Sequence, residues 1–284
     1  MKLSKIFALL LALCLISSAA CAATFTDAHG NVIELDDSLE AYAAVTLVGA
    51  DNAARQGETN LGDLWADALR WFAVSGEINA AFDEDDVKAG NDRIAVDADH
   101  VVALWNGGNL RADIAEGTFG AEALAEVLPF PNKVAVVYMT GAQLLETLEA
   151  ASQGLPYTAE TADACASLMQ VSGLTYTVDT TKAYDALEAY GDHWFTAGSV
   201  SRVRIDDVNG QPFDAEATYA VVTSNANFNG MDSSYVLKAA AEANEQSAVT
   251  TAVVRDVVFR FIASELNHQV GEAYAAPQGR LTIL

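Results

Sequence analysis

The spacing of apolar residues changes several times along the chain, and each change marks an expected structural element. Residues 24–35 alternate apolar and polar positions around the turn-forming run 27–31, which predicts a small β-hairpin. From 60 to 72, apolar residues recur at helical spacing. Asn60 is the expected N-cap of this helix, and Asp63 adds a favourable charge in its first turn. A firm helix is therefore predicted to begin at Asn60.

Further along, a continuous apolar run over 101–105 predicts a buried strand that leads into the loop 106–109. Thr140 and Gln143 have capping-box spacing and predict the start of a second helix. Other expected elements are a helix over 121–127, a strand over 134–138, strand-like alternation over 168–178, a helix over 253–262 and a closing strand over 280–284. Helices mixed with hairpins and single crossings predict one layered α/β or α+β domain.

A turn signal in the second half predicts a hairpin. Residues 200–205 alternate as a strand, Asn209-Gly210 is a strong turn pair, and 219–222 forms a second apolar run. We expect the two runs to pair with each other across this turn.

The first residues have the layout of a secretory signal. Lys2 and Lys5 precede an apolar run over 7–16 that is shorter than the roughly 20 residues needed to span a bilayer. Residues 1–22 are expected to be a signal peptide removed before Ala23, with 23–54 as an N-terminal hairpin extension and 55–284 as the main domain. A secreted or extracytoplasmic protein with no transmembrane segment after signal removal is favoured, and a lipid anchor at Cys21 is the alternative.

The chain is strongly acidic, with 39 Asp and Glu against 15 Lys and Arg and a formal net charge of -24. A nucleic acid partner is excluded on this ground, because affinity for a polyanion comes mainly from clustered basic side chains. A small phosphorylated ligand is compatible, since it needs only one or two well-placed guanidinium groups. Cys165 is the only cysteine outside the signal-like segment, so no internal disulfide is expected.

Candidate chemistry is concentrated in two segments. Asn106, Gly107, Gly108 and Arg111 combine paired glycines, which allow close approach of the backbone to a ligand, with a guanidinium suited to phosphate. Such a glycine pair alone marks an ordinary turn more often than a site. Phe130 lies at a proline corner where it can stack on a planar ring, although a phenylalanine is more often part of a core. The four histidines show no metal-binding spacing, and no Gly-x-Ser-x-Gly elbow is present.

Taken together and in order, several motifs resemble the C-terminal domain of the 5'-nucleotidase and UDP-sugar hydrolase family. They cover about 55–284 and comprise Gly57 to Leu64 with Ala66-Asp67-Ala68, the Asn-Gly-Gly-x-x-Arg run from Asn106 with the following Ile-x-x-Gly, Leu128-Pro129-Phe130-Pro131-Asn132, Met139-Thr140-Gly141, Gln170-Val171-Ser172-Gly173-Leu174 and Gly279-Arg280-Leu281-Thr282-Ile283.

The resemblance implies a four-layer α/β/β/α sandwich that binds the nucleoside and helps to hold the phosphate. In the family a separate N-terminal domain carries two divalent metals, and we expect this chain to lack that domain and to bind no cofactor itself. By the same resemblance, Asn106 would contact substrate near the metals and Arg111 would hold phosphate. Phe130 would stack on the base, and Asn132 would hydrogen-bond the base or ribose.

The chain departs from the family where a second stacking phenylalanine is expected. When Asp232 is aligned with the family motif, the stacking position is occupied by Ala226, and Phe228 is displaced by two residues. Phe228 and Asp232 are nevertheless included among the candidate substrate-binding residues. An additional family arginine near Gly57 is only approximately matched by Arg55.

Three functions follow from the resemblance. The first is an exported nucleotide- or nucleoside-binding domain that is related to enzymes of nucleotide catabolism and phosphate ester hydrolysis but is inactive alone. The second is one subunit of a split nucleotidase whose metal centre lies on a separate metallophosphoesterase chain. The third is a degenerate scaffold or surface interaction module.

Overall fold

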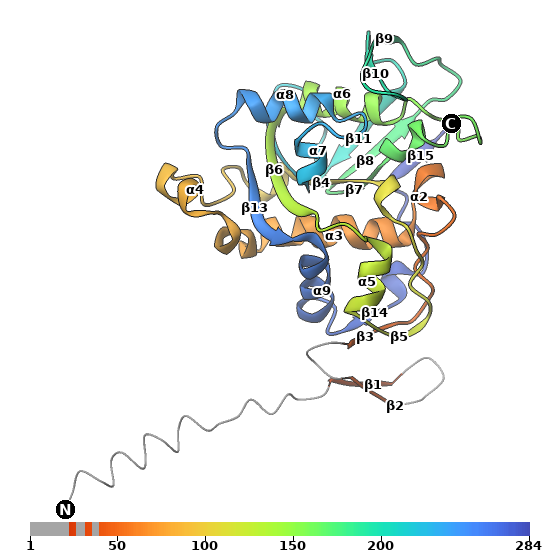
Figure 1. The fold of residues 1–284 in the computed structure, drawn as a ribbon, viewed down its shortest axis with the longest axis vertical. Coiled ribbons are helices and arrows are strands. Elements are labelled where there is room, and N and C mark those ends of the chain that lie inside the picture. Colours follow the sequence, from red (N-terminus) through yellow and green to blue (C-terminus); the bar gives the residue numbers. More distant parts are fainter. Residues whose placement is uncertain (1–22, 27–31, 36–39) are drawn as a thin grey trace, which may run out of the picture.

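The computed structural model describes residues 23–26, 32–35 and 40–284 (Figure 1). The predicted signal peptide over 1–22, with Cys21, lies outside the described residues. The predicted N-terminal hairpin is confirmed, because β1 (Ala23–Thr26) and β2 (Val32–Leu35) pair as antiparallel strands. Within the described ranges, no helix is both long enough and apolar enough to cross a membrane.

A five-stranded mixed sheet forms the centre of the molecule. Its strands, in spatial order, are β13 (Ala248–Val253), β6 (Lys133–Thr140), β12 (Thr218–Ser224), β4 (Val101–Asn106) and β7 (Met169–Ser172). Only β12 and β4 run parallel, and the other neighbours are antiparallel. Every residue of β4 is buried, which explains why its sequence is apolar without alternation.

One face of this sheet is covered by two helices, α3 (Asn60–Val74) and α9 (Val254–Ser264) (Figure 1). The helix α3 presents Leu64 and Trp65 to the sheet, and the ring centroid of Trp65 lies 6.1 Å from that of Trp105 on β4. The short helix α5 (Ala121–Val127) packs beside α9. The amphipathic spacing of 60–72 therefore corresponds to a helix whose apolar side closes one core.

The other face supports a second core. Two helices and a three-stranded sheet contribute to it: α6 (Gly141–Ala151), α8 (Tyr235–Ala243), β11 (Val203–Val208), β8 (Leu174–Val178) and β15 (Leu281–Ile283). The predicted capping box is present at α6, where Thr140 and Gln143 each satisfy the backbone of the other. Helix α6 contacts both sheets. The predicted mixed α/β class, with helices outside packed sheets, is confirmed.

Smaller elements complete the described chain. They are the sheet of β14 (Gln269–Val270), β3 (Glu40–Ala43) and β5 (Gly117–Gly120), the hairpin of β9 (Ala186–Ala189) and β10 (Phe195–Ala197), the helices α2 (Ala53–Gln56), α4 (Glu84–Ala89) and α7 (Asn225–Phe228), and the short 3-10 helices η1 (Glu77–Ala81), η2 (Ala98–His100), η3 (Gly107–Asn109), η4 (Ala164–Ser167) and η5 (Glu272–Tyr274).

The N-cap of α3 differs from the prediction. The capping side chain is Thr59, whose hydroxyl accepts a hydrogen bond from the Gly62 amide at 3.0 Å. Asn60 is buried in the first turn, and its side-chain amide donates to the carbonyls of Thr46 and Tyr274. Because those carbonyls come from distant segments, Asn60 joins the start of α3 to two other parts of the fold and does not cap the helix.

The predicted hairpin between 200–205 and 219–222 is wrong. Asn209 and Gly210 do form a turn, with φ values of 51° and 79°, but it closes only the single bridge Val208–Gln211. Strand β11 pairs with β8, whereas β12 lies between β6 and β4. The reason is burial: β12 is buried from its second residue to its last, so it needs a position inside the larger sheet.

The strand-like alternation predicted over 168–178 corresponds to two strands. Gly173, with φ of 80°, separates β7 in the large sheet from β8 in the smaller one. A left-handed conformation is readily adopted by glycine, and here it redirects the chain from one sheet to the other.

Candidate ligand-binding cavity

A cavity of about 750 Å³ opens where four segments of the fold meet. Its walls come from η3 and the residues after it, from the corner between α5 and β6, from η4, and from α7 with the turn that follows. Five of the eight predicted site residues line it: Gly108, Arg111, Phe130, Asn132 and Asp232. Segments distant in sequence therefore converge on one hollow.

Asn106 lies behind the wall of the cavity. It ends β4 and is only 2% exposed. Its side-chain nitrogen donates to Asp232 Oδ2 at 2.8 Å, and its oxygen accepts from Asn109 Nδ2 at 2.8 Å. Both ends of the amide are thus engaged, so Asn106 orients two cavity residues that come from different walls.

The two glycines are required for packing against the protein itself. A Cβ atom on Gly107 would lie 2.0 Å from the Ala54 carbonyl oxygen, and one on Gly108 would lie 2.7 Å from the Ala166 side chain. The Gly107 amide donates to the Leu168 carbonyl at 2.7 Å. Gly107 therefore allows a close approach to α2, and the approach of this loop to a ligand stays a prediction.

Arg111 and Phe130 face each other at the cavity. The guanidinium carbon lies 5.8 Å from the centre of the Phe130 ring, within the range of a cation–π contact. Phe130 is 42% exposed, which is unusual for a large apolar side chain. The Arg111 amide donates to the Val127 carbonyl at 2.9 Å and so fixes the arginine beside the corner. A cation and an aromatic face are available side by side.

The corner that carries Phe130 is held where it leads into β6. The Asn132 carbonyl accepts from the Val254 amide at 2.9 Å, and the Lys133 amide donates to the Asn225 side chain at 2.9 Å. Asn225 also lines the cavity. The aromatic wall and α7 are therefore coupled through β6.

Asp232 supplies a carboxylate to the same cavity from the turn after α7. Its backbone is left-handed, with φ of 56°, which is uncommon for a residue with a side chain. Burial raises the pKa of Asp232, while Arg55, the hydrogen bond from Asn106 and Arg111 oppose that rise. Such a carboxylate can accept hydrogen bonds from hydroxyl groups.

Arg55 adds a second positive charge close to this site. It is 9% exposed on α2, its Nη1 donates to the Ala162 carbonyl at 2.9 Å, and it lies 3.7 Å from Asp163. Burial lowers the pKa of Arg111, and repulsion from Arg55 lowers it further. The partial match of Arg55 to a family arginine was the sequence signal for this residue.

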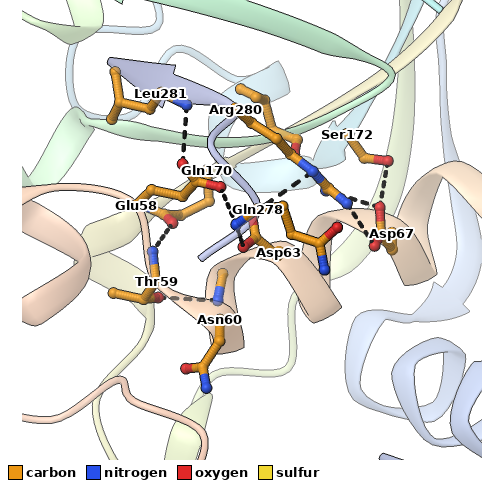
Figure 2. Close-up of polar contacts among 12 residues, drawn as sticks. Glu58, Thr59, Asn60, Asp63, Asp67, Gln170, Ser172, Gln278, Arg280 and Leu281 are labelled. Carbon is orange, nitrogen blue, oxygen red and sulfur yellow. Dashed lines mark hydrogen bonds and ion pairs between the residues drawn. The ribbon is translucent and has the colours of Figure 1, made fainter. Parts of the chain in front are cut away.

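A buried glutamine fixes the segment that carries Arg55. Gln170, on β7, donates from Nε2 to the carbonyls of Ala54 and Gly57 at 3.0 and 2.9 Å. Its Oε1 accepts from the Thr59 amide at 3.0 Å (Figure 2). A Cβ on Gly62 would lie 2.1 Å from that same Oε1. The position of α2 therefore depends on one side chain of the central sheet.

Next to this glutamine, carboxylates of the α3 region hold the C-terminal segment (Figure 2). Glu58 accepts from the amides of Gln278 and Leu281 at 2.8 and 3.0 Å, and Asp63 accepts from Gln278 at 3.1 Å. Arg280 pairs with Asp67 at 2.8 Å. Burial raises the pKa of Asp63 to about 8, with Arg280 opposing and Glu58 adding to the rise.

Phe228 is not among the residues that line this cavity, and its assignment as a substrate-binding residue stays a prediction. Its partly buried side chain packs against the second core. Ala226, on the same short helix, does line the cavity. Met231 and Asn229 line the cavity in this region, and the sequence had not indicated them.

No group of three or more His, Cys, Asp or Glu side chains suited to a metal ion occurs within 40–284 or the two short ranges before it. The polar groups of the cavity are amides, one guanidinium and one carboxylate. This donor set suits hydrogen bonding to a ligand with anionic and hydroxyl groups.

Comparison with known proteins gives a consistent result. The profile of the 5'-nucleotidase, C-terminal domain, matches residues 40–239. The trifunctional nucleotide phosphoesterase protein YfkN of Bacillus subtilis is 28% identical over 188 residues, which make up 65% of this chain and 10% of that protein.

Solved structures agree in fold. The 5'-nucleotidase precursor of Thermus thermophilus is similar with a TM-score of 0.61 and 30% identity, over 86% of this chain and 39% of that one. The NAD nucleotidase of Haemophilus influenzae has a TM-score of 0.56 at 15% identity, over 86% of this chain and 38% of that one, and shows the shared fold alone. The chain thus spans about two fifths of these solved relatives and a tenth of the curated one.

Proposed function

Since the chain belongs to the family of 5'-nucleotidase C-terminal domains, we propose that its cavity binds a nucleotide or nucleoside. The observation that carries this proposal is the meeting of the Arg111 guanidinium and the Phe130 ring in one cavity of about 750 Å³. That volume lies within the range typical of small-molecule sites. A nucleotide combines a planar ring with an anionic group, which is the combination these two side chains suit.

Each wall of the cavity has a proposed part in binding. Phe130 stacks on the base, and base stacking on an aromatic side chain contributes about 1 to 3 kcal/mol. Arg111 binds the phosphate through charge-assisted hydrogen bonds, with Arg55 adding a positive potential behind it. Asn132 hydrogen-bonds the base or ribose, and Asp232 accepts hydrogen bonds from sugar hydroxyls. Asn106 keeps Asp232 in place.

The relatives' names support a nucleotide as the ligand class. The Bacillus subtilis relative is a nucleotide phosphoesterase, and the Thermus thermophilus structure is a 5'-nucleotidase precursor. Isothermal titration of the purified protein with adenosine, AMP, ADP and UDP-glucose tests the proposal. We expect a dissociation constant in the micromolar to millimolar range for at least one of them. Absence of binding to all four would refute it.

We propose that binding is not accompanied by hydrolysis when the protein acts alone. The polar side chains of the cavity are amides, a guanidinium and a carboxylate, and the relatives' hydrolytic activity belongs to much longer proteins. Phosphate release from AMP, measured with and without manganese, is expected to stay at the background rate. Metal-dependent release by the purified protein would contradict this.

A split nucleotidase is the second candidate, and the observation that favours it is the coverage of only 39% of the Thermus thermophilus relative. In that case a separate metallophosphoesterase chain would cover the mouth of the cavity. Affinity purification from the native host should then recover such a chain in a fixed ratio. We further propose that the protein acts outside the cytoplasm, on the signal-like sequence over 1–22, which cell fractionation tests.

A further inference from the structure

Met231 is an apolar side chain that the fold presents to the candidate cavity. It is 56% exposed and lines the cavity together with Phe130, which is 42% exposed. Both belong to the ten exposed large hydrophobic side chains among the described residues, and they come from different walls. Most of the other lining side chains are polar or small. Exposed apolar groups collected in one hollow with a few polar side chains are typical of a ligand-binding groove.

The backbone around Met231 is held rigidly. The Met231 amide donates to the Ala226 carbonyl at 3.0 Å, and the Met231 carbonyl accepts from the Ser234 amide at 3.1 Å. The residues on either side, Gly230 and Asp232, both have left-handed backbones, with φ of 86° and 56°.

Contacts from outside this turn fix it further. The Gly230 carbonyl accepts from the Tyr190 hydroxyl at 2.8 Å, and a Cβ on Gly230 would lie 2.3 Å from that hydroxyl oxygen. The Asp232 carboxylate is held by Asn106. A left-handed aspartate costs free energy, and such strain persists where the surrounding structure determines it, often beside a ligand.

The neighbouring wall leaves room that Met231 can fill. Ala226 lines the cavity from α7 and ends at its Cβ, while Phe228 on the same turn packs against the second core. Met231 is therefore the long apolar side chain available on this side of the cavity. Methionine is flexible and polarisable, and its sulfur makes favourable contacts with aromatic rings.

We propose that Met231 forms a second apolar wall against the aromatic ring of the ligand and makes the cavity tolerant of ring size. The inference rests on the proposed nucleotide-binding function. Because a methionine side chain can adjust to rings of different size, purine and pyrimidine nucleotides bind with similar affinities. Ligands that lack a planar base gain nothing from Met231.

The test compares ligands with and without a base. AMP, UMP and ribose 5-phosphate are titrated calorimetrically into the wild-type protein and into Met231→Ala. The variant is expected to bind AMP and UMP about 2- to 12-fold more weakly, the range that a sulfur–ring contact gives. Ribose 5-phosphate is expected to bind equally to both proteins. Met231→Leu, which keeps an apolar side chain of similar length, should retain most of the affinity for AMP.

A matched control is Val87→Ala, which truncates an exposed apolar side chain on α4 that does not line the cavity and should leave all affinities unchanged. Unchanged AMP binding by Met231→Ala would overturn the inference and leave the proposed function standing. An equal loss for AMP and ribose 5-phosphate would also overturn it, because the change would then act on the shape of the cavity. Absence of nucleotide binding by the wild type would refute the proposed function itself.

Discussion

The buried carboxyl of Asp63 leads to a prediction that stability falls as pH rises through the neutral range. Asp63 is fully buried in the first turn of α3, and burial raises its pKa to about 8. The Arg280 guanidinium opposes this rise, and the adjacent Glu58 carboxylate reinforces it. The Arg280 guanidinium lies 3.8 Å from Asp63 Oδ1 and 2.8 Å from Asp67 Oδ1, so its charge is shared between two carboxyl groups. We therefore predict that, between pH 3.8 and about 8, the folded protein keeps a proton on Asp63 that the unfolded chain releases.

The sign and size follow from proton linkage. Because the folded-state pKa of Asp63 lies above the unfolded value of 3.8, the folded state binds more protons between pH 3.8 and about 8. Its contribution to the free energy of unfolding is fully present below pH 3.8 and is lost as the pH rises toward 8. One proton corresponds to at most about 1.4 kcal/mol per pH unit, so the loss between pH 5 and 7 is at most about 3 kcal/mol.

The assay is urea unfolding of the wild type and Asp63→Asn at pH 5, 6 and 7. Asparagine keeps the shape of the side chain but does not titrate. The stability of the wild type relative to the variant should decrease steadily as the pH rises. Asp256→Asn, in the exposed first turn of α9, is the matched control and should show no such trend. A difference between wild type and Asp63→Asn that stays constant from pH 5 to 7 would refute the reasoning.

Three further predictions concern the cavity and the core. Arg111→Ala should weaken AMP binding about 10- to 100-fold, because a hydrogen bond to a charged group contributes about 1.5 to 3 kcal/mol. Adenosine has no phosphate, so its binding should be nearly unchanged. Equal losses for both ligands in calorimetry would contradict this. Gly107→Ala should destabilise the fold by about 1 to 3 kcal/mol in urea unfolding, because its Cβ would lie 2.0 Å from the Ala54 carbonyl oxygen. The control is Gly271→Ala, whose Cβ would meet no atom within 4 Å and which should be neutral. Glu149→Gln should cost about 1 to 3 kcal/mol, because it removes the charge of a buried acceptor. Oε2 of Glu149 accepts from the amides of Arg202 and Val203 at 2.9 and 2.8 Å, and Oε1 accepts from the Arg202 amide at 3.2 Å, whereas a glutamine NH2 group in place of one oxygen cannot accept. A thermal midpoint equal to the wild type would argue against this.

Elements encoded by local signals were predictable from the sequence. The capping box at Thr140 and the continuous apolar run of β4 both depend on neighbours within a few residues, and both are present in the structure. Strand pairing was not predictable in the same way. The Asn209-Gly210 turn forms, yet its flanking strands enter different sheets, because burial of β12 on both faces outweighs the local preference for a hairpin.

The candidate cavity was only partly predictable. Motif order brought Arg111, Phe130, Asn132 and Asp232 to attention, and the structure places all four around one hollow. Whether they bind a ligand remains a prediction. Met231 carries no sequence signal, because its exposure to the cavity depends on how the turn after α7 folds.

A recognisable motif can also have a packing role that its sequence does not reveal. The Asn-Gly-Gly run suggested a backbone that approaches a ligand, which stays a prediction, and the structure adds that Gly107 lets the end of β4 and α2 pack together. Asn106 is buried and joins Asn109 to Asp232. The paired glycines in the sequence indicate that the backbone of this loop makes a close contact. The structure identifies the contacting atoms.

The most direct test of the central claim is a crystal structure of the protein soaked with AMP. We predict that the adenine ring lies against Phe130 and that the phosphate oxygens lie within hydrogen-bonding distance of the Arg111 guanidinium. AMP bound at another surface, or a cavity that stays empty at saturating AMP, would contradict the account.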